Sequence, residues 1–440
     1  MSKPRKIIPQ SSLEAQVLAA LQSRQERGIL RRLPNPTSLS SSTNTNLVDF
    51  NSNDYLSLAT SLNLRARFIQ KLQSAQDILG SGGSRLLVNG QAHSALEARL
   101  AQFFASPAAI LFNSGFDANV GFFSCIPQIG DVVVYDEYIH ASVHDGIRAS
   151  RARGAHFSFE HNSLSSFKEL LKKLLSERPE LQTGQSSLFV AVESLYSMDG
   201  TFAPLEGIVH ILEDYFPQSN GFLIVDEAHA TGIYGPQGRG RVAELGLEDK
   251  VLARLHTFGK ALAATGAVLL TKPFIRDYLL NYARSLIYTT SLSHANIIAA
   301  DSAFIRISES LAHIITQLSR HLLDLSRYFL DTLSPQLRDV PMHILALPVE
   351  IQHASPPSPI IPVMTTRPRP LSAYLMQRGL NARPITWPTV PKGKDRVRVC
   401  LHAGNSQGDV DRLVQGMMEW ARGEMAHDEA AVRTVVQSKL

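Results

Sequence analysis

The sequence predicts an α/β fold in which helices cover both faces of a mostly parallel sheet. Short apolar runs alternate along the chain with helix-like segments such as 164–175, and this order is typical of α/β proteins. Most of the runs are continuously apolar, which indicates strands buried on both faces. The 440 residues are 44% hydrophobic and 19% charged, a composition that permits a large core and excludes a disordered or fibrous protein.

The predicted elements follow one another in a simple order. A helical arm runs from Ser11 to about Arg32, and a loop rich in Ser, Thr and Asn follows at 38–46. The region 297–333 has apolar residues at helical spacing, and prolines cluster at 341–359, which indicates a change of unit. The runs that predict strands lie at 108–112, 131–136, 187–193, 221–226, 253–258 and 266–271. We divide the chain into an N-terminal arm and loop (1–50), a large domain (51–300), a linking helix with a small C-terminal α+β domain (301–425) and a tail (426–440).

Composition and charge argue against several classes of protein. Lys and Arg total 43 against 39 Asp and Glu, and the net charge of +4 is too small to indicate a nucleic-acid binder. Cys125 and Cys400 are too few for a disulfide framework or a tetrahedral zinc site. Because no uninterrupted apolar run approaches about 18 residues, the sequence predicts no membrane span. The first residues lack the apolar stretch of a secretory signal.

Polar side chains follow three of the predicted strands, where reactive groups gather in α/β proteins. Asp226 ends one run and His229 comes three residues later, while Lys260 follows another run. The turn Asn113-Ser-Gly-Phe-Asp117 leads into a helix, whose free N–H groups suit a phosphate. Alone, each is an ordinary helix cap, solvated lysine or turn. Together they match what pyridoxal 5'-phosphate requires: a lysine for the aldehyde, a carboxylate for the ring nitrogen and a phosphate cradle.

Two other chemistries are less well supported. Asp226-Glu-Ala-His229 also spells the acidic box of a helicase, but the sequence contains no Gly-x-x-x-x-Gly-Lys-[Ser/Thr] loop. His140 and His144 have a spacing that suits a metal on a helix, yet no nearby Glu completes a zinc motif. We therefore predict neither a helicase nor a metal site.

A collinear set of motifs from about residue 47 to 420 resembles the α-oxoamine synthases. The motifs are Asn53-Asp-Tyr-Leu-Ser-Leu, Gly80-Ser-Gly-Gly-Ser-Arg, Ser197-Met-Asp-Gly-Thr-Phe-Ala-Pro-Leu, Val225-Asp-Glu-Ala-His-Ala-Thr-Gly, Thr257-Phe-Gly-Lys-Ala and Pro388-Thr-Val-Pro. The resemblance implies a fold-type I transferase that depends on pyridoxal 5'-phosphate, with a mostly parallel seven-stranded sheet in its large domain. It also implies the decarboxylative condensation of an amino acid with an acyl-CoA, in a homodimer with shared active sites.

The resemblance also implies a role for each matched residue. Lys260 is expected to bond to the cofactor aldehyde, Asp226 to pair with the pyridine nitrogen, and His140 to stack on the ring. The other cofactor-binding residues expected are Ser114, Gly115, Phe116, Ser197, His229, Thr257, Thr289 and Thr290, of which the last two serve the neighbouring subunit. The substrate-binding residues expected are Asn53, Arg383 and Arg398. Arg398 suits the amino-acid carboxylate because a planar guanidinium binds it bidentately, and Glu193 matches a position that lines the pocket.

The substrates expected from the resemblance are L-alanine and pimeloyl-CoA, as in the 8-amino-7-oxononanoate synthases of biotin biosynthesis. The sequence finishes with Ser438-Lys439-Leu440, the tripeptide that the peroxisomal import receptor reads. Because peroxisomes shorten fatty chains, pimeloyl-CoA made there would meet the enzyme. The sequence also lacks the membrane segment usual in eukaryotic serine palmitoyltransferase subunits. We therefore expect a peroxisomal enzyme with an exposed, polar tail.

Alternatives stay open because the sequence departs from the bacterial pattern at the acyl end. Thr386 stands where the bacterial enzymes have an arginine, and Arg383 is the nearest replacement. Another α-oxoamine synthase, of the secondary-metabolite, aminolevulinate or sphingoid-base type, therefore remains possible. A catalytically silent partner subunit is disfavoured by the presence of Lys260 and Asp226. A fold-type I aminotransferase or lyase is disfavoured by the motif Pro388-Thr-Val-Pro.

Overall fold

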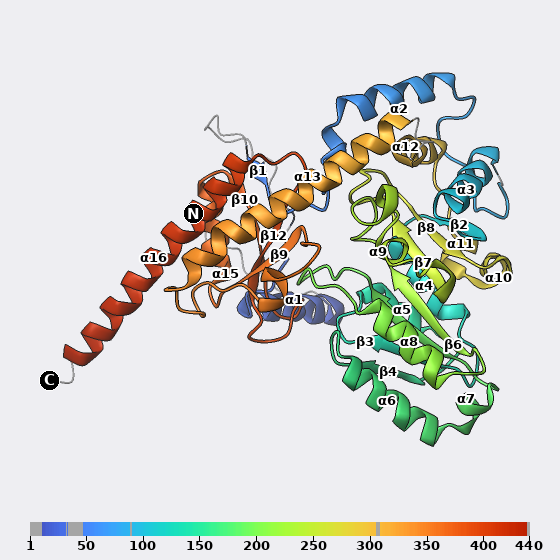
Figure 1. Cartoon of the computed structure of the whole chain (residues 1–440), viewed down its shortest axis with the longest axis horizontal. Coiled ribbons are helices and arrows are strands. Elements are labelled where there is room, and N and C mark those ends of the chain that lie inside the picture. The colour runs from blue at the N-terminus through green and yellow to red at the C-terminus, as the bar shows by residue number, and fades with distance from the viewer. Residues whose placement is uncertain (1–10, 32, 34–46, 89, 305–308, 438–440) are drawn as a thin grey trace.

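Two domains joined by a long helix make up the computed structural model, which describes the chain except for residues 1–10, 32, 34–46, 89, 305–308 and 438–440 (Figure 1). The large domain contains a seven-stranded sheet and the small domain a three-stranded sheet. Helix α13 (Glu309–Leu333) runs from one domain to the other (Figure 1). The α/β class predicted from the sequence is confirmed.

The large sheet is parallel except at one strand. Its strands lie in the order β2-β8-β7-β6-β5-β3-β4. Strand β8 is antiparallel to both of its neighbours, and the other neighbouring pairs are parallel. The bounds are β2 (Ala108–Phe112), β3 (Val132–Asp136), β4 (His156–Phe159), β5 (Leu188–Glu193), β6 (Gly221–Asp226), β7 (Val251–Thr257) and β8 (Ala267–Thr271). The apolar runs missed β4, because His156 and Ser158 are exposed at this edge of the sheet.

Helices cover both faces of the sheet because its central strands carry apolar side chains on both sides. In β3, Val133 packs in one cluster with Phe122 of α4, whereas Val132 and Val134 pack in another with Phe167 of α6. The helices of the large domain are α2 (Leu62–Ser74), α3 (Gln91–Phe103), α4 (Gly115–Cys125), α5 (Ala141–Arg148), α6 (Leu164–Glu177), α7 (Pro179–Thr183), α8 (Leu205–Tyr215), α9 (Arg241–Glu244), α10 (Pro273–Tyr282), α11 (Arg284–Ile287) and α12 (His294–Phe304).

The small domain packs helices against an antiparallel sheet in the order β11-β12-β9. Its elements are α14 (Val349–Gln352), β9 (Ile360–Met364), α15 (Pro368–Gln377), β10 (Leu380–Asn381), β11 (Arg383–Ile385), β12 (Arg396–Cys400) and α16 (Gln407–Gln437). Strand β1 (Val48–Asp49) pairs with β10, and Phe50 and Tyr55 share a core cluster with Phe329 and Trp420. This core therefore joins both sides of the boundary predicted at residue 50, and the domain limits stay a prediction.

The N-terminal arm is a shorter helix than predicted. Helix α1 (Ser12–Glu26) begins after Ser11, whose hydroxyl accepts the N–H of Glu14, and Gly28 follows it with a left-handed φ of +64°. The loop predicted at 38–46 and the terminal tripeptide lie outside the described residues. Within the described part of the chain, no helix has both the length and the apolar character needed to cross a bilayer.

Gly200 lies at a close contact between the two domains. Its φ of +71° is left-handed, and a Cβ there would overlap the carbonyl oxygen of Ile360 in β9. Gly246 has a similar φ of +64°, but a Cβ at Gly246 would meet nothing within 4 Å. The two glycines therefore share the same backbone requirement and differ in their surroundings.

We predict that Gly200→Ala destabilises the protein far more than Gly246→Ala. The left-handed conformation alone costs an alanine about 1–2 kcal/mol, which is the loss expected for Gly246→Ala. At Gly200 the overlap with Ile360 adds to that cost, so we expect a loss of more than about 3 kcal/mol. Urea unfolding of both variants measures the difference. Equal losses would contradict the close contact between the domains.

Candidate active site

A cavity of about 800 Å³ lies between the carboxyl ends of the parallel strands and the small domain. Its walls come from the loops that follow β3 and β5, from the segment Trp387–Pro391 and from β12. Six of the residues predicted from the sequence line it: Asn53, His140, Ser197, His229, Lys260 and Arg398. The fold therefore gathers residues that lie more than 300 positions apart in the sequence.

Asp226 provides a fixed carboxylate at the end of β6. The side chain is buried, and its Oδ2 accepts a hydrogen bond of 2.8 Å from Asn119 Nδ2. Its Oδ1 accepts the backbone N–H of Ala228 at 2.9 Å. Asn119 is in turn held by Ser142 Oγ at 3.0 Å. A carboxylate fixed from two sides is suited to hold a proton on a ring nitrogen.

Lys260 follows β7 and is poised to act as a neutral amine. Burial lowers the pKa of its ammonium group. Asp226 and Glu193 raise this pKa in part, and the positive charge of Arg398 lowers it again. A desolvated lysine of this kind is a better nucleophile and base than a solvated one. This environment favours the functional interpretation of Lys260 over that of a surface lysine.

The two histidines of the site are held in different ways. His229 is buried, and its Nδ1 lies 2.7 Å from the hydroxyl of Tyr55. Burial holds the pKa of His229 well below its usual range, so its ring is neutral. His140 caps α5, where its Nδ1 lies 2.8 Å from Ser142 Oγ, and its ring is exposed to the cavity. The edge-on ring of Phe116 stands 6.4 Å from that of His140.

The start of α4 offers a site for an anion. Ser114 is the N-cap, and its hydroxyl accepts the N–H of Asp117. The N–H groups of Gly115 and Phe116 begin the helix and have no acceptor within it. Thr257 is adjacent, because a Cβ at Gly115 would lie 3.6 Å from its Cβ. Free N–H groups at the positive end of a helix, next to a hydroxyl, suit a phosphate.

These groups fit pyridoxal 5'-phosphate. Asp226, Lys260 and the start of α4 supply the three contacts that the sequence analysis required. Glu193 adds a further observation, because its Oε1 is buried and has no hydrogen-bond partner among the described residues. Burial, together with the neighbouring Asp226, raises the pKa of Glu193 well above its usual range, so burial favours the protonated form of Glu193, which can donate to a bound molecule.

Arg398 reaches the cavity from β12 with its guanidinium already oriented. Its Nη1 donates to the carbonyl oxygen of Ser197 at 2.9 Å, and its Nη2 donates to Asn53 Oδ1 at 3.2 Å and to the carbonyl oxygen of Asn51 at 3.3 Å. Its Nε is buried and has no partner among the described residues. A buried, aligned guanidinium is suited to bind a carboxylate.

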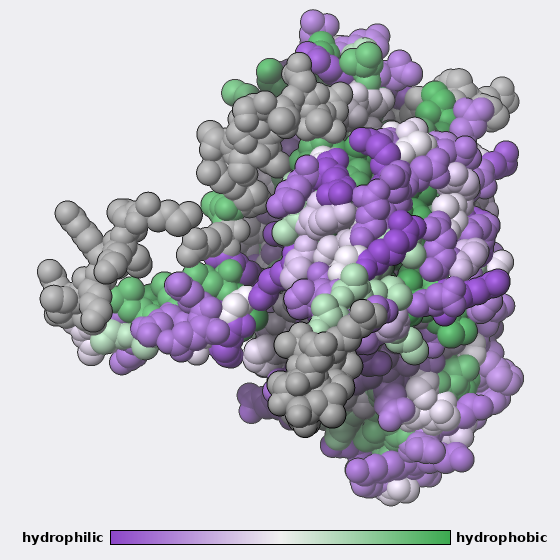
Figure 2. Space-filling model, turned by 90° about the vertical axis from the view of Figure 1, so that its left-hand side faces the viewer, coloured by the Kyte–Doolittle hydropathy of each residue, from purple (hydrophilic) through white to green (hydrophobic). Residues whose placement is uncertain are grey.

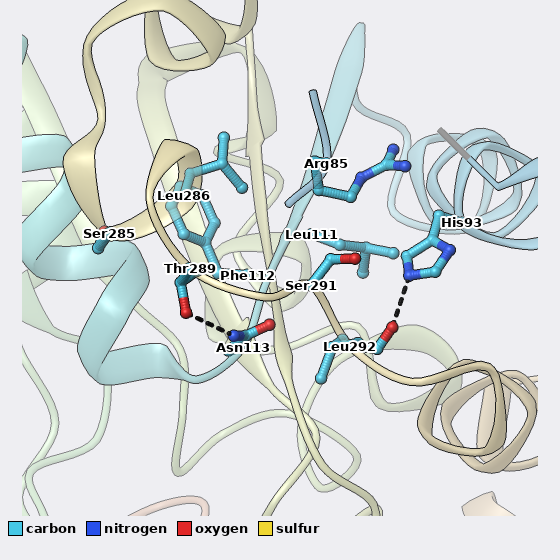
Figure 3. Close-up of a pocket in the computed structure, with 10 residues that line it drawn as sticks. All are labelled: Arg85, His93, Leu111, Phe112, Asn113, Ser285, Leu286, Thr289, Ser291 and Leu292. Carbon is cyan, nitrogen blue, oxygen red and sulfur yellow. Dashed lines mark hydrogen bonds between the residues drawn. The ribbon is translucent and has the colours of Figure 1, made fainter. Parts of the chain in front are cut away.

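Thr289, Thr290 and Arg383 are among the predicted residues that do not line this cavity. Asn113 Nδ2 donates to Thr289 Oγ1 at 3.3 Å (Figure 3). It also donates to the carbonyl oxygen of Thr290 at 2.6 Å. Thr289 lines a small separate pocket beside Ser291 (Figure 3). Arg383 is exposed on β11 and does not line the cavity. The role assigned to each residue by the resemblance stays a prediction.

The sequence analysis missed several residues of the site. Tyr55 and Asn119 each hold a functional side chain through a long-range hydrogen bond, which no local pattern announces. Tyr55 does fall within the motif that begins at Asn53. Arg31 and Trp387 line the cavity from the arm and from the segment before Pro388. A cation that follows an exposed N-terminal helix gives no signal of its position in the fold.

Comparison with known proteins agrees with this geometry. Residues 45–417 match the family model of aminotransferase class I and II. An 8-amino-7-oxononanoate synthase of Emericella nidulans is 45% identical over 408 residues, covering 91% of this chain and 94% of the relative. The aminoacyl transferase sphA of Aspergillus fumigatus is 39% identical over 383 residues, covering 85% of this chain and 81% of the relative.

Solved structures share the fold. A serine palmitoyltransferase from S. paucimobilis superposes with a TM-score of 0.74 at 22% identity, covering 94% of this chain and 99% of that one. An 8-amino-7-oxononanoate synthase from Francisella tularensis gives 0.67 at 24% identity, covering 86% and 99%. The chain belongs to the aminotransferase class I and II family, within which it is an α-oxoamine synthase, an acyl-transferring enzyme that depends on pyridoxal 5'-phosphate.

Proposed function

We propose that the enzyme joins L-alanine to pimeloyl-CoA and releases CoA, carbon dioxide and 8-amino-7-oxononanoate, a step of biotin biosynthesis. The observation that carries the proposal is the cavity that places Lys260 in a common space with Arg398 and Arg31, two of the three arginines that line it; the third, Arg396, is attracted to Asp199. An amino acid and an acyl chain that ends in a carboxylate present two separate anions, and each arginine can pair with one. The relative from Emericella nidulans bears the name of this activity.

The residues of the cavity divide the work. Pyridoxal 5'-phosphate, when bound, withdraws electrons from the α-carbon of the amino acid. Asp226 holds the proton on the pyridine nitrogen that this withdrawal needs. Arg398 and Asn53 hold the amino-acid carboxylate, and the neutral amine of Lys260 removes the α-proton. His140 shields one face of the site, so that the reacting carbon is open to the acyl thioester from the other.

Arg383 is expected from the sequence to replace the arginine of the bacterial enzymes at the acyl end of the cavity, but a different arginine lies there. Arg31 lines the cavity, whereas Arg383 is exposed outside it. Trp387, the residue after Thr386, adds an apolar wall. We therefore assign the terminal carboxylate of the acyl chain to Arg31 and the contact with its methylene groups to Trp387.

A second candidate function is condensation with a longer, uncharged acyl-CoA. The indole of Trp387 in the cavity wall favours an apolar chain, and the relative named aminoacyl transferase sphA covers 85% of this chain. A silent partner subunit has less support, because Lys260, Asp226 and Arg398 are all present and in contact with, or beside, one cavity.

The substrates can be tested by measuring free thiol. The holoenzyme is incubated with L-alanine, glycine or L-serine, each combined with pimeloyl-, succinyl- or palmitoyl-CoA. We expect the highest kcat/KM for L-alanine with pimeloyl-CoA. Lys260→Ala is expected to lose turnover by more than about a thousandfold. Lys250→Ala, which removes an exposed lysine paired with Glu213, is expected to keep full activity. A preference for palmitoyl-CoA would support the second candidate, and no thiol release with any pair would contradict both.

We also propose a homodimer in which each subunit completes the other's site. Thr289 and Thr290 do not line the cavity of their own subunit. The neighbouring Tyr288 is 73% exposed, and Phe116, at the start of α4, is 44% exposed. Exposed aromatic residues beside a site are typical of a surface that another chain covers.

Complementation between two inactive variants tests the shared site. Lys260→Ala and the double variant Thr289→Ala/Thr290→Ala are each expected to be weakly active or inactive alone. In a dimer with one copy of each, one site has both Lys260 and the two threonines intact. After mixing and subunit exchange, we expect activity to rise to about a quarter of the wild-type value. Activity equal to the average of the two variants would argue against shared sites.

We further propose that the enzyme works in peroxisomes. Helix α16 extends beyond the small domain and carries the C-terminal end of the chain away from the body of the protein (Figure 1). The face seen from that side is mostly hydrophilic (Figure 2). Both features support an accessible tail, although Ser438–Leu440 lies outside the described residues.

Removal of the last three residues tests the location. In a cell with peroxisomes, the full chain with a fluorescent protein at its N-terminus is expected to colocalise with a peroxisomal marker. The same fusion ending at Gln437 is expected to stay diffuse, because the import receptor reads the terminal tripeptide. Diffuse fluorescence of both fusions would refute the proposal.

A further inference from the structure

A buried cluster centred on His161 lies directly behind the wall of the active-site cavity. His161 follows β4, and 15% of its side chain is exposed. Its ring stacks on Tyr138 at 4.3 Å and meets Tyr196 edge-on at 4.5 Å. Tyr138, Tyr196 and Asp199 line the cavity, whereas His161 does not. The histidine is therefore placed to act on the site through its neighbours.

Both ring nitrogens of His161 face carboxylates. Nδ1 lies 2.8 Å from Asp136 Oδ1, and Nε2 lies 3.2 Å from Asp199 Oδ2 and 2.8 Å from Thr201 Oγ1. A neutral imidazole donates from one nitrogen, so it would leave a lone pair facing one carboxylate, whereas an imidazolium donates to both. Asn162 Nδ2 stands 3.1 Å from Nε2 and donates to Thr201 Oγ1 at 3.1 Å, while Asn162 Oδ1 is buried and has no partner in the described part of the chain. The side-chain amide of Asn162 has nearly the same shape when it is rotated by half a turn. In that orientation Oδ1 faces Nε2–H and is another acceptor for it.

The charges around His161 come from four segments and nearly balance. Asp136 ends β3, and Glu137 follows it and accepts the backbone N–H of His161 at 3.0 Å. Asp199 lies in the loop after β5, and Arg396 of β12 attracts it from the small domain. Tyr138 and Tyr196 add two hydroxyl groups. Two cations, His161 and Arg396, thus stand among three carboxylates, and removal of the histidine charge raises the excess of carboxylates from one to two.

Asp136 and Asp199 belong to different parts of the fold. Asp136 is anchored to the sheet edge by the N–H groups of Tyr138 and Asn162, at 2.9 and 2.8 Å. Asp199 belongs to the turn Tyr196–Thr201, which is closed by hydrogen bonds between the backbones of its two ends. The Ser197 carbonyl in this turn accepts Nη1 of Arg398. His161 therefore links the rigid sheet to the turn that orients Arg398.

We propose that His161, as an imidazolium, is a positioning residue that ties the turn Tyr196–Thr201 to the sheet and so fixes Arg398 for the amino-acid carboxylate. The proposal rests on the function proposed above for Arg398. Loss of the charge releases Asp199, and the carbonyl of Ser197 then no longer holds the guanidinium in one orientation. The expected consequence is weaker binding of the amino acid with little change in the chemical step.

The contribution of His161 to amino-acid binding is expected to vanish in alkaline solution. Burial opposes the charged form, but the hydrogen bonds to Asp136 and Asp199 outweigh it and raise the pKa of His161 to about 9. Because the pKa in the folded protein lies above its ordinary value, the stabilisation is complete below about pH 6.5 and is lost as the pH rises through about 9. At neutral pH the imidazolium is intact in the folded protein.

The experiment compares wild type with His161→Gln, which keeps the size and hydrogen bonding of the side chain without its charge. At pH 7.5 we expect the KM for L-alanine to rise about tenfold, with kcat within about twofold, because the guanidinium of Arg398 is less well oriented for the carboxylate while the reacting groups are unchanged. The ratio of the two KM values should fall towards one above about pH 9. The ratio is used because titration of the alanine amine affects both enzymes equally. His210→Gln, at an exposed histidine 3.5 Å from Asp214, is the matched control and is expected to change nothing.

Two further measurements keep the proposal open to refutation. In Asp199→Asn one carboxylate partner of His161 is lost, so the pH at which the KM of this variant rises should move down by about one unit or more. The pH dependence of urea unfolding needs no substrate: the stability lost in His161→Gln should be greatest below about pH 6.5 and absent above about pH 9. A KM ratio that is the same at every pH, with an unfolding difference that is also constant, would overturn the proposal. If L-alanine has no effect on the wild-type enzyme, the proposed substrate fails, and the unfolding profile alone decides whether His161 is a charged link.

Discussion

The site depends on three buried ionisable groups, two carboxyl groups and one amine, at the ends of β5, β6 and β7. Glu193 and Asp226 lie opposite each other on neighbouring strands, and Lys260 follows the next strand. Two carboxyl groups and one amine cannot all be ionised cheaply in an apolar surrounding. The fold raises the pKa of Glu193 and lowers that of Lys260, while the carboxyl group of Asp226 accepts two hydrogen bonds.

This arrangement exists because the strands that bear it are buried on both faces. The apolar residues of β5 and β6 pack into clusters on opposite sides of the sheet, which fixes the register of the two strands. In this register Glu193 is paired with Asp226. A shift of register by one residue would turn these side chains to the other face. The small domain adds what the sheet cannot supply, namely Arg398, and at Gly200 the loop after β5 lies in close contact with Ile360 of β9.

Much of this could be predicted from the sequence, and the remainder has a common physical cause. Continuous apolar runs identified six strands, and polar residues at their ends identified Asp226, His229 and Lys260. The edge strand β4 escaped because its exposed residues break the run, as expected where one side of a strand meets water. Tyr55, Asn119 and Arg31 escaped because their roles come from tertiary contacts between distant segments, which neither spacing nor composition encodes. Arg383 shows that closeness in the sequence can also mislead. It is three positions from Thr386 but lies outside the cavity.

His161 and Lys260 place opposite demands on pH. Lys260 is useful when neutral, and burial lowers its pKa to favour that form. The link through His161 is useful when charged, and its two carboxylates hold the pKa at about 9. In isolation a lysine would titrate above a histidine, and both groups could not be in their working forms together. The fold shifts the two pKa values towards each other and so favours the neutral amine and the charged imidazolium together. Burial lowers the pKa of both groups, so the difference lies in their surroundings: the positive charge of Arg398 lowers the pKa of Lys260 further, whereas His161 has one carboxylate for each ring nitrogen.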